Sequence, residues 1–434
     1  MKNFLNSFFK LESHNTSIKT EIIAGFTTFI TMVYIIIVNP DIMSDSGMDQ
    51  DAIFVGTCLA AAIACILMGL FANWPIGLAP GMGLNVFFTY TVVGQMGYEW
   101  PVALGAVFIA GILFFLISIT NLRRWMIDSI PFNLRIAIGA GVGLFIGFLG
   151  LQKGGIVINH DEVLVQLGDF ASIETLLAAL SFIIILVLGK RKIPGEIIIG
   201  ILTTTLIAFL LGMVSYGGVF SKPPDISPTL MRLDILGALD VAMISVIMSF
   251  LFVNLFDTTG TLIGVASRAN LLNDEGEAKN LDKALKADSS ASIFGTFFGC
   301  SPVTSYVESS AGVEVGGRTG LTAVIVGVLF IFAIFLAPLS KMVPEYATAG
   351  ALLYVCFLML SGMQNLNWDD SKELIPALII MVMIPLTYSI ANGIALGFLV
   401  YIVLKISSGE LYKISSGAWF LTIIFISNFI FLQN

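Results

Sequence analysis

The chain has 434 residues, of which 57% are hydrophobic and only 12% are charged, and its formal net charge is −8. Soluble domains carry about 25% charged residues, so this composition excludes a soluble globular protein and indicates an integral membrane protein. The four cysteines lie within apolar stretches without a CxxC pair, and the two histidines lie in polar stretches. These positions argue against disulfides, a metal site and haem, so we expect no cofactor.

Runs of about 17 to 25 apolar residues predict membrane-spanning helices. In chain order they cover 21–39, 52–73, 100–120, 134–152, 173–189, 195–216, 237–267, 319–340, 346–363, 373–389 and 390–405. Three shorter or interrupted segments, at 79–97, 289–300 and 301–317, bring the predicted number of transmembrane segments to fourteen. A further apolar stretch at 417–431 remains outside this count.

The distribution of basic residues predicts the orientation of these segments. If the N-terminus is cytoplasmic, 17 of the 21 lysines and arginines lie on the cytoplasmic side, and the exceptions are Lys153, Lys222, Arg232 and Lys341. The loop "NPDIMSDSGMDQD" after the first segment is acidic, as an external loop is allowed to be. We therefore expect a multi-pass protein of the cytoplasmic (cell) membrane with its N-terminus in the cytoplasm.

A weak internal repeat accompanies this count. Shifting the chain by 222 residues lays Pro80 on Pro302 and Gly105 on Gly327. Seven spans per repeat is an odd number, so the second copy is inverted in the membrane, which is the pattern of secondary transporters. The predicted units are a first inverted repeat at 1–216, an external linker at 217–236, a second inverted repeat at 237–410 and a C-terminal hydrophobic tail at 411–434.

The interrupted segments 79–97 and 301–317 are predicted to form the binding site. They carry the stretches "GLAPGMGLN" and "CSPVTSYVESSAG", which are rich in glycine, proline and hydroxyl groups. Irregular backbone at membrane depth is tolerated only where protein or a polar cavity covers it. Two Pro-kinked packing helices are the structural alternative. Because the interruptions occur at equivalent positions of both repeats, we favour the binding site.

Two carboxylates are predicted near the middle of the membrane. Glu308 lies ten residues before Arg318, and Asp257 lies eleven residues before Arg268. At 1.5 Å per helical residue, each acid is about 15 Å from the basic surface of the membrane. Acids at this depth are costly and mark functional sites by default, while a structural salt bridge is the alternative. No basic partner is predicted at that depth, so we expect both acids to be protonatable.

The same residues carry a resemblance to a known family. The stretches "GLAPGMGLN", "FDTTGTLIGVA" and "SYVESSAGVEVGGRTGLTA" resemble the signatures of azaguanine-like purine permeases, which belong to the nucleobase:cation symporters. The resemblance covers nearly the whole chain. It implies the uracil-permease fold, an all-α polytopic membrane protein of fourteen segments in two inverted repeats of seven. In that fold, core and gate domains draw on both repeats, and short antiparallel strands open the third and tenth segments.

The resemblance also implies proton-coupled import of adenine, guanine or hypoxanthine, and a site for it. Asp257 and Glu308 are the expected proton-coupling residues. Some members of the family have aspartate where this chain has Asn254, which leaves the ligand preference and the proton count open. The residues expected to contact the purine are Asn85, Phe87, Phe88, Asn254, Tyr306 and Glu308.

The chemistry of these side chains suits a purine. An amide donates and accepts side by side, as in recognition of adenine elsewhere, and an ionised Glu308 can accept two N–H groups. The aromatic rings are candidates to cover a purine face, with packing inside the bundle as the alternative. The expected partners are a purine nucleobase, a proton and the lipid bilayer, without nucleic acid, and a homodimer is left open.

Three other functions are alternatives to a coupled purine transporter. An anion carrier of the same fold would need bare half-helix N-termini or a central arginine, and Glu308 argues against it. A membrane enzyme would need a nucleophile with a base or a metal cluster, and the apolar segments contain no histidine. A passive channel would lack coupling to an ion and could not concentrate its substrate.

Overall fold

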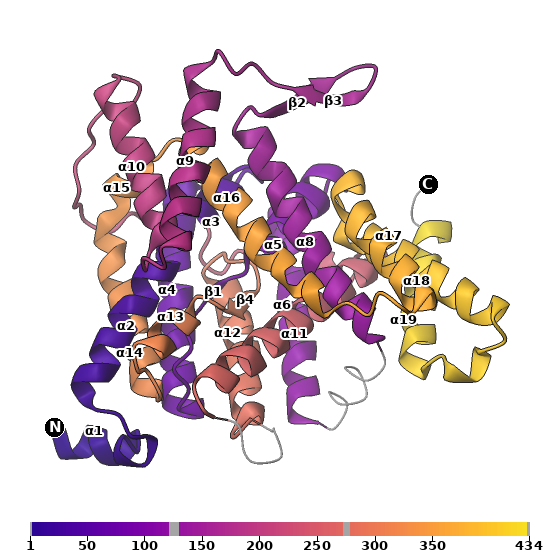
Figure 1. Ribbon diagram of the computed structural model, residues 1–434, viewed down its shortest axis with the longest axis horizontal. Helices are drawn as coiled ribbons and strands as arrows, with labels where there is room; N and C mark the ends of the chain where they lie inside the picture. Colours follow the sequence, from indigo (N-terminus) through magenta and orange to yellow (C-terminus); the bar gives the residue numbers. More distant parts are fainter. Residues whose placement is uncertain (1, 121–129, 272–277, 432–434) are drawn as a thin grey trace.

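The computed structural model describes residues 2–120, 130–271 and 278–431 (Figure 1). Within this part of the chain, nine helices are long and apolar enough to cross a membrane, and Glu196–Leu210 is a shorter apolar helix. The nine are Ile18–Ser44, Gln50–Ala72, Trp100–Ile119, Phe132–Lys153, Ile173–Lys190, Met243–Arg268, Gly320–Lys341, Glu345–Asn365 and Ile390–Ser407. The chain is therefore a mostly helical, polytopic membrane protein.

Most helices fall into two groups by their packing. In the first helix group, α4 packs against α14 and α12 packs against α6 and α4. Its members are α2 (Ile18–Met32), α3 (Ile35–Ser44), α4 (Gln50–Leu67), α5 (Met82–Val86), α6 (Trp100–Ile119), α11 (Met243–Arg268), α12 (Leu281–Phe297), α13 (Ser309–Glu314) and α14 (Gly320–Ala333). The first group thus combines helices from both halves of the chain.

The second helix group lies beside the first. Here α8 packs against α16 and α17, and α9 packs against α16 and α10. Its members are α8 (Phe132–Lys153), α9 (Ile173–Lys190), α10 (Glu196–Leu210), α16 (Glu345–Leu360), α17 (Ser371–Thr387) and α18 (Ile390–Ser407). The two groups meet through sparser contacts, among them α5 and α11 against α8 and α3 against α16.

Two short strands from distant parts of the sequence pair inside the first group. Strand β1 (Leu78–Pro80) is antiparallel to β4 (Val303–Ser305), and both lie near the middle of the molecule (Figure 1). The backbone N–H of Gly81 donates to the carbonyl of Pro302 at 2.9 Å, which continues the pairing past the strand. The pairing satisfies backbone groups that lipid could not, and it brings the beginnings of α5 and α13 together.

The structure differs from the sequence prediction at the ninth segment. The sequence predicted a short segment at 289–300, whereas α12 begins at Leu281 and includes a polar stretch around the buried Asp288. Residues 281–288, which lie between two predicted segments, are therefore helical, because Thr258 and Ser305 satisfy the buried Asp288 carboxylate.

The prediction that continuous helix separates Glu308 from Arg318 is also wrong. Helix α13 ends at Glu314, so the residues between these two side chains do not form one continuous helix. Helix α11 is continuous from Met243 to Arg268, so the same distance argument stands for Asp257.

Other elements lie outside the two groups. They are α1 (Lys2–Phe8), α15 (Ala337–Lys341) and α19 (Ser416–Phe431), and a hairpin of β2 (Val157–His160) and β3 (Leu164–Leu167) that the sequence did not predict. The hairpin projects from the top of the molecule in Figure 1, opposite the N-terminus. Most of its side chains are exposed, and hydropathy gives no distinct signal for strands of only four residues.

Candidate functional site

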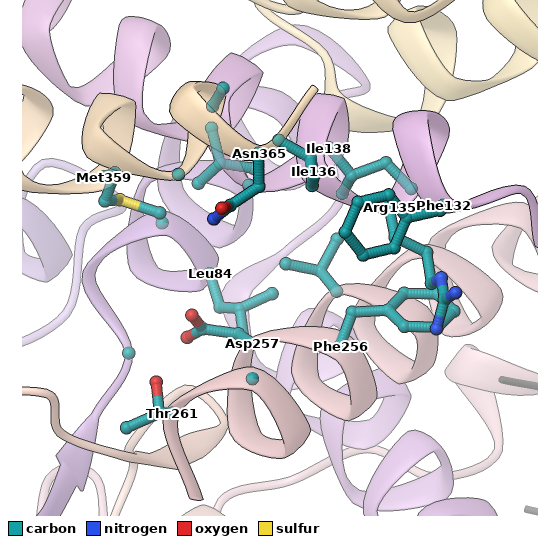
Figure 2. A pocket seen from close by; sticks show the side chains of 18 residues that line it. Leu84, Phe132, Arg135, Ile136, Ile138, Phe256, Asp257, Thr261, Met359 and Asn365 are labelled. Carbon is teal, nitrogen blue, oxygen red and sulfur yellow. The ribbon is translucent and has the colours of Figure 1, made fainter. Parts of the chain in front are cut away.

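A cavity of about 340 Å³ lies where the two helix groups meet (Figure 2). A smaller cavity of about 80 Å³ adjoins it, because the two share Gly81, Gly83, Asp257, Thr261 and Met359. The larger volume falls within the range of about 300 to 1,000 Å³ that is usual for small-molecule sites. The first group lines the cavity with α5 and α11, and the second group lines it with α8 and the end of α16.

Asp257 lies between the two cavities and lines both of them. Its carboxylate points into the open space in Figure 2, and its residue is exposed there. Helix α11 places it four residues before Thr261, so the two side chains share a helix face. In the described part of the chain, no side chain hydrogen-bonds to or ion-pairs with the Asp257 carboxylate, which leaves it available to a ligand or a proton.

Glu308 occupies the N-terminal cap position of α13 and lines the smaller cavity. The Tyr34 hydroxyl donates a 2.7 Å hydrogen bond to its Oε1 atom. Tyr34 is fully buried at the break between α2 and α3, and the same cavity includes its side chain. The break between α2 and α3 therefore meets the interrupted segment 301–317 at the Glu308 carboxylate.

Tyr306 links the two strands next to this carboxylate. Its hydroxyl donates to the backbone carbonyl of Pro80 at 2.6 Å, and its backbone N–H donates to Gly77 at 3.0 Å. Its side chain is buried and also lines the smaller cavity. The structure thus brings together three residues that the sequence singled out, namely Asp257, Tyr306 and Glu308.

Asn254 lies behind strand β4 and is not among the residues that line either cavity. Its amide donates to the Ser292 hydroxyl at 3.0 Å, and that hydroxyl donates to the Val303 carbonyl at 2.7 Å. The Thr258 hydroxyl lies 3.2 Å from the Asn254 carbonyl oxygen and 3.0 Å from an oxygen of Asp288. Asn254 thereby connects α11 to α12 and to β4.

Asp288 completes this buried network. Its second carboxylate oxygen accepts a 2.7 Å hydrogen bond from Ser305 in β4. The side chain is fully buried, and hydropathy could not select it, because it lies in a polar stretch between two predicted segments. The alternation of small and hydroxyl residues in "ADSSAS" is the signal that marks a helix packed against polar neighbours.

Asn85 forms an equivalent network on the other interrupted segment. It donates to Asn39 and accepts from Ser301, while Asn39 donates to Thr57 at 2.6 Å. The Asn85 side chain is fully buried, and it is not among the residues that line either cavity. Its hydrogen-bonding groups serve the junction of α3, α4 and the two interrupted segments.

Phe87 and Phe88 are also fully buried and do not line the cavities. Phe87 packs edge-on against Phe250, with 5.0 Å between the ring centroids. The apolar walls of the larger cavity include Leu84, Phe256 and Met359 instead (Figure 2). Hydropathy could not select Phe256, because its direction depends on how α11 is rotated about its axis.

Two polar residues of the second helix group also line the larger cavity. Arg135 lies in the first turn of α8 with its guanidinium 5.6 Å from the centre of the Phe132 ring, and Asn365 follows α16. Figure 2 shows the Asn365 amide turned towards the same space as Asp257. Within the described residues, no cluster of His, Cys, Asp or Glu is arranged to hold a metal ion.

Residues 19–396 match the model of a family described as the Permease family. This chain belongs to the Permease family. It is 48% identical over 432 residues to the adenine permease AdeP of Escherichia coli (strain K12), covering 100% of this chain and 97% of that protein. It is 40% identical to the guanine/hypoxanthine permease PbuG of Bacillus subtilis (strain 168), covering 99% of this chain and 100% of that protein.

Solved structures show the same fold in more distant proteins. The transmembrane domain of a cyanobacterium bicarbonate transporter, BicA, aligns with a TM-score of 0.63 at 16% identity, over 87% of this chain and 97% of that one. Murine Slc26a9, titled an anion transporter in the inward-facing state, aligns with a TM-score of 0.63 at 12% identity, over 94% and 72%. At such identities the likeness concerns the fold alone.

The sequence-based resemblance to purine permeases is confirmed by these relatives. This permease is a membrane transporter and not an enzyme, so the enzyme alternative is set aside.

Proposed function

We propose that this permease imports purine nucleobases, with adenine as the first candidate, by proton symport and alternating access. The relatives named as adenine permease and guanine/hypoxanthine permease support the substrate class. The observation that carries the proposal is that Asp257 and Glu308, from two different segments, line adjoining cavities between the two helix groups. Glu308 accepts a hydrogen bond from Tyr34, whereas no side chain in the described part of the chain hydrogen-bonds to or ion-pairs with Asp257.

The cavity suits a flat, uncharged ring with N–H groups along its edge. An ionised Glu308 accepts N–H groups in charge-assisted hydrogen bonds, which a water-poor cavity strengthens. Phe256 and Leu84 offer apolar surface for the ring faces, and Thr261 adds a hydroxyl. We assign Glu308 as a substrate ligand and Asp257 as the residue that carries or relays the coupling proton.

The two amide side chains, of Asn85 and Asn254, have a structural role in this proposal. Asn85 and Asn254 hold the two interrupted segments against their neighbours, and Phe87 and Phe88 pack behind them. Direct contact of these four residues with the purine stays a prediction, since in this conformation they do not line the cavities.

The proposed topology has fourteen segments in two inverted repeats, 1–216 and 237–410, with 217–236 as an external linker and 411–434 as a tail. Helices α2 and α3 form the first segment, and α17 and α18 form the last two. The first helix group is the proposed core domain and the second the proposed gate domain. The distribution of basic residues among the loops supports a cytoplasmic N-terminus and a location in the cytoplasmic membrane. A homodimer stays a separate prediction.

Uptake of radiolabelled adenine tests this function in cells that lack their own purine permeases. We expect accumulation above the external concentration, and we expect an uncoupler of the proton gradient to abolish that accumulation. Uptake that equilibrates without accumulation and ignores the uncoupler would identify a passive channel. Absence of adenine, guanine and hypoxanthine uptake, with transport of an inorganic anion, would favour the anion carrier of the same fold.

A further inference from the structure

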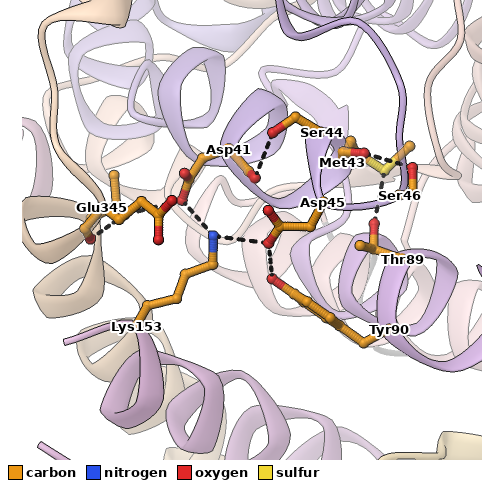
Figure 3. Close-up of polar contacts among 10 residues, drawn as sticks. Asp41, Met43, Ser44, Asp45, Ser46, Thr89, Tyr90, Lys153 and Glu345 are labelled. Carbon is orange, nitrogen blue, oxygen red and sulfur yellow. Dashed lines mark hydrogen bonds and ion pairs between the residues drawn. The ribbon is translucent and has the colours of Figure 1, made fainter. Parts of the chain in front are cut away.

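A charged cluster surrounds Lys153 at the C-terminal end of α8 (Figure 3). The larger cavity is lined by the N-terminal half of the same helix. Phe132 and Arg135, in the first turn of α8, line the cavity, and the 52% exposure of Phe132 shows that this end reaches the surface. Lys153 is the last residue of the same helix. A helix of 22 residues is about 33 Å long, so Phe132 and Lys153 are separated by about the thickness of the membrane core.

Lys153 is shared by two carboxylates of the first helix group. Its Nζ atom lies 3.2 Å from Asp41 and 3.2 Å from Asp45. Tyr90 donates a 2.6 Å hydrogen bond to Asp45, and Thr348 of α16 donates to Asp41 at 3.2 Å. The Lys153 side chain is 10% exposed and that of Asp41 is 13% exposed, so solvent and salt screen this pair only partly.

A second contact lies at the same end of the bundle. Thr91 donates to the backbone carbonyl of Tyr388, and the Tyr388 hydroxyl donates to Gln152, the neighbour of Lys153. Thr91 belongs to the segment that follows α5, whereas Tyr388 follows α17 in the second helix group. Charged and neutral hydrogen bonds therefore connect the two groups at the end where Lys153 lies.

Helix α3 joins this cluster to the site. Tyr34, which bonds to Glu308, lies seven residues before Asp41, a separation that puts both on one helix face. Seven residues correspond to about 10 Å of helix. The cluster thus lies along α3 from the Glu308 carboxylate, and its ion pairs cross the boundary between the two helix groups.

We propose that Lys153, Asp41 and Asp45 form an ion-pair latch that closes the path between the helix groups at the end of α8 opposite Phe132 and Arg135. The proposal rests on the proposed function, because alternating access requires this contact to break when substrate enters from that side. One lysine neutralises two carboxylates, so its removal abolishes both ion pairs and leaves two like charges facing each other. Removal of one aspartate leaves the other ion pair in place.

Accessibility of a cysteine beneath the latch tests the proposal without any substrate. Ile37 is 6% exposed and lies one helical turn from Asp41 towards the site. Ile37→Cys is introduced into the full-length chain carrying Cys356→Ser, because Cys356 is the only native cysteine in the described residues that is not fully buried. Intact cells are treated with a membrane-impermeant maleimide, and the chain without Ile37→Cys measures background labelling.

We expect Lys153→Gln to raise the labelling rate about tenfold, Asp41→Asn and Asp45→Asn to raise it less, and Lys153→Arg to leave it nearly unchanged. A tenfold rise corresponds to about 1.4 kcal/mol in the equilibrium between closed and open states. Thermal unfolding in detergent checks that each variant is folded. If Lys153→Gln unfolds the protein, the two aspartate variants still decide the question.

Unchanged labelling in folded Lys153→Gln and aspartate variants would overturn the latch, whether or not adenine is transported. Faster labelling in a chain that transports no purine would support the latch and reject the proposed substrate instead. The two proposals therefore fail in different measurements.

Discussion

Tyr34 donates a 2.7 Å hydrogen bond to the carboxylate of Glu308, so the break between α2 and α3 meets the beginning of α13. This bond occupies one oxygen of a carboxylate that lines the smaller cavity. A purine N–H can then bind a carboxylate that is already held in place, which lowers the entropic cost of binding.

Tyr34→Phe should weaken purine transport without abolishing it. The substitution removes one hydrogen bond to a charged group, which contributes about 1.5 to 3 kcal/mol, and we expect at least a tenfold rise in the KM for adenine. Tyr354→Phe is the matched control, because its hydroxyl bonds to Glu196 at 3.4 Å and it does not line the cavities. A normal KM in Tyr34→Phe would show that Glu308 needs no such support.

Glu308→Gln should abolish adenine uptake while the protein still inserts in the membrane. The amide can still accept the Tyr34 bond, but it lacks the charge that favours the purine N–H groups. Glu314→Gln is the control, because Glu314 is exposed on the same short helix and does not line either cavity. Normal uptake by Glu308→Gln, at equal membrane levels, would remove Glu308 from the site.

Asp257→Asn should separate binding from coupling. Asp257 has no partner in the described chain, so its neutral amide should keep the cavity intact and lose only the exchangeable proton. We expect retained adenine binding by purified protein and lost accumulation against a gradient in cells. Loss of binding, together with residual flux that still depends on pH, would reassign Asp257 as a ligand.

Asn254→Asp tests selectivity through the buried network. A carboxylate cannot donate to Ser292 as the amide does, and it adds a second acid to the network of Asp288. The lost donor should lower the free energy of unfolding by about 1 to 3 kcal/mol. We expect the added charge to move α11 relative to β4. This movement should change the ranking of adenine against hypoxanthine and guanine, which is measured by competition for labelled adenine uptake. An unchanged ranking would mean that Asn254 has no part in discrimination.

Glu410 is a titratable residue that we expect to have no effect on the pH dependence of uptake. It lies between α18 and α19, and hydrogen bonds from Lys372, Lys405 and Lys413 lower the pKa of its carboxyl from 4.5 to about 2. Its stabilising contribution is therefore complete above pH 4.5 and is lost only as the pH falls towards 2. Glu410→Gln should leave the pH profile of uptake between about pH 5 and 8 unchanged. A shifted profile would implicate this cluster in coupling.

Hydropathy, the distribution of basic residues and the placement of acids were sufficient to predict a polytopic membrane protein and to select Asp257 and Glu308. These features can be recognised in the sequence alone, because burying a charge in lipid is so costly that an acid within an apolar segment indicates a function. The specific motifs around these acids were sufficient for the family.

The direction of each side chain depended on the tertiary structure. Asn85 and Asn254 looked equivalent to the two acids as polar residues in apolar segments, yet their neighbours Ser301 and Ser292 satisfy them away from the cavities. Tyr34 gave no signal within an apolar run, and Lys153 looked like a lone external charge. Helix rotation and the packing of segments far apart in sequence decide which polar groups meet, and no local pattern encodes those two quantities.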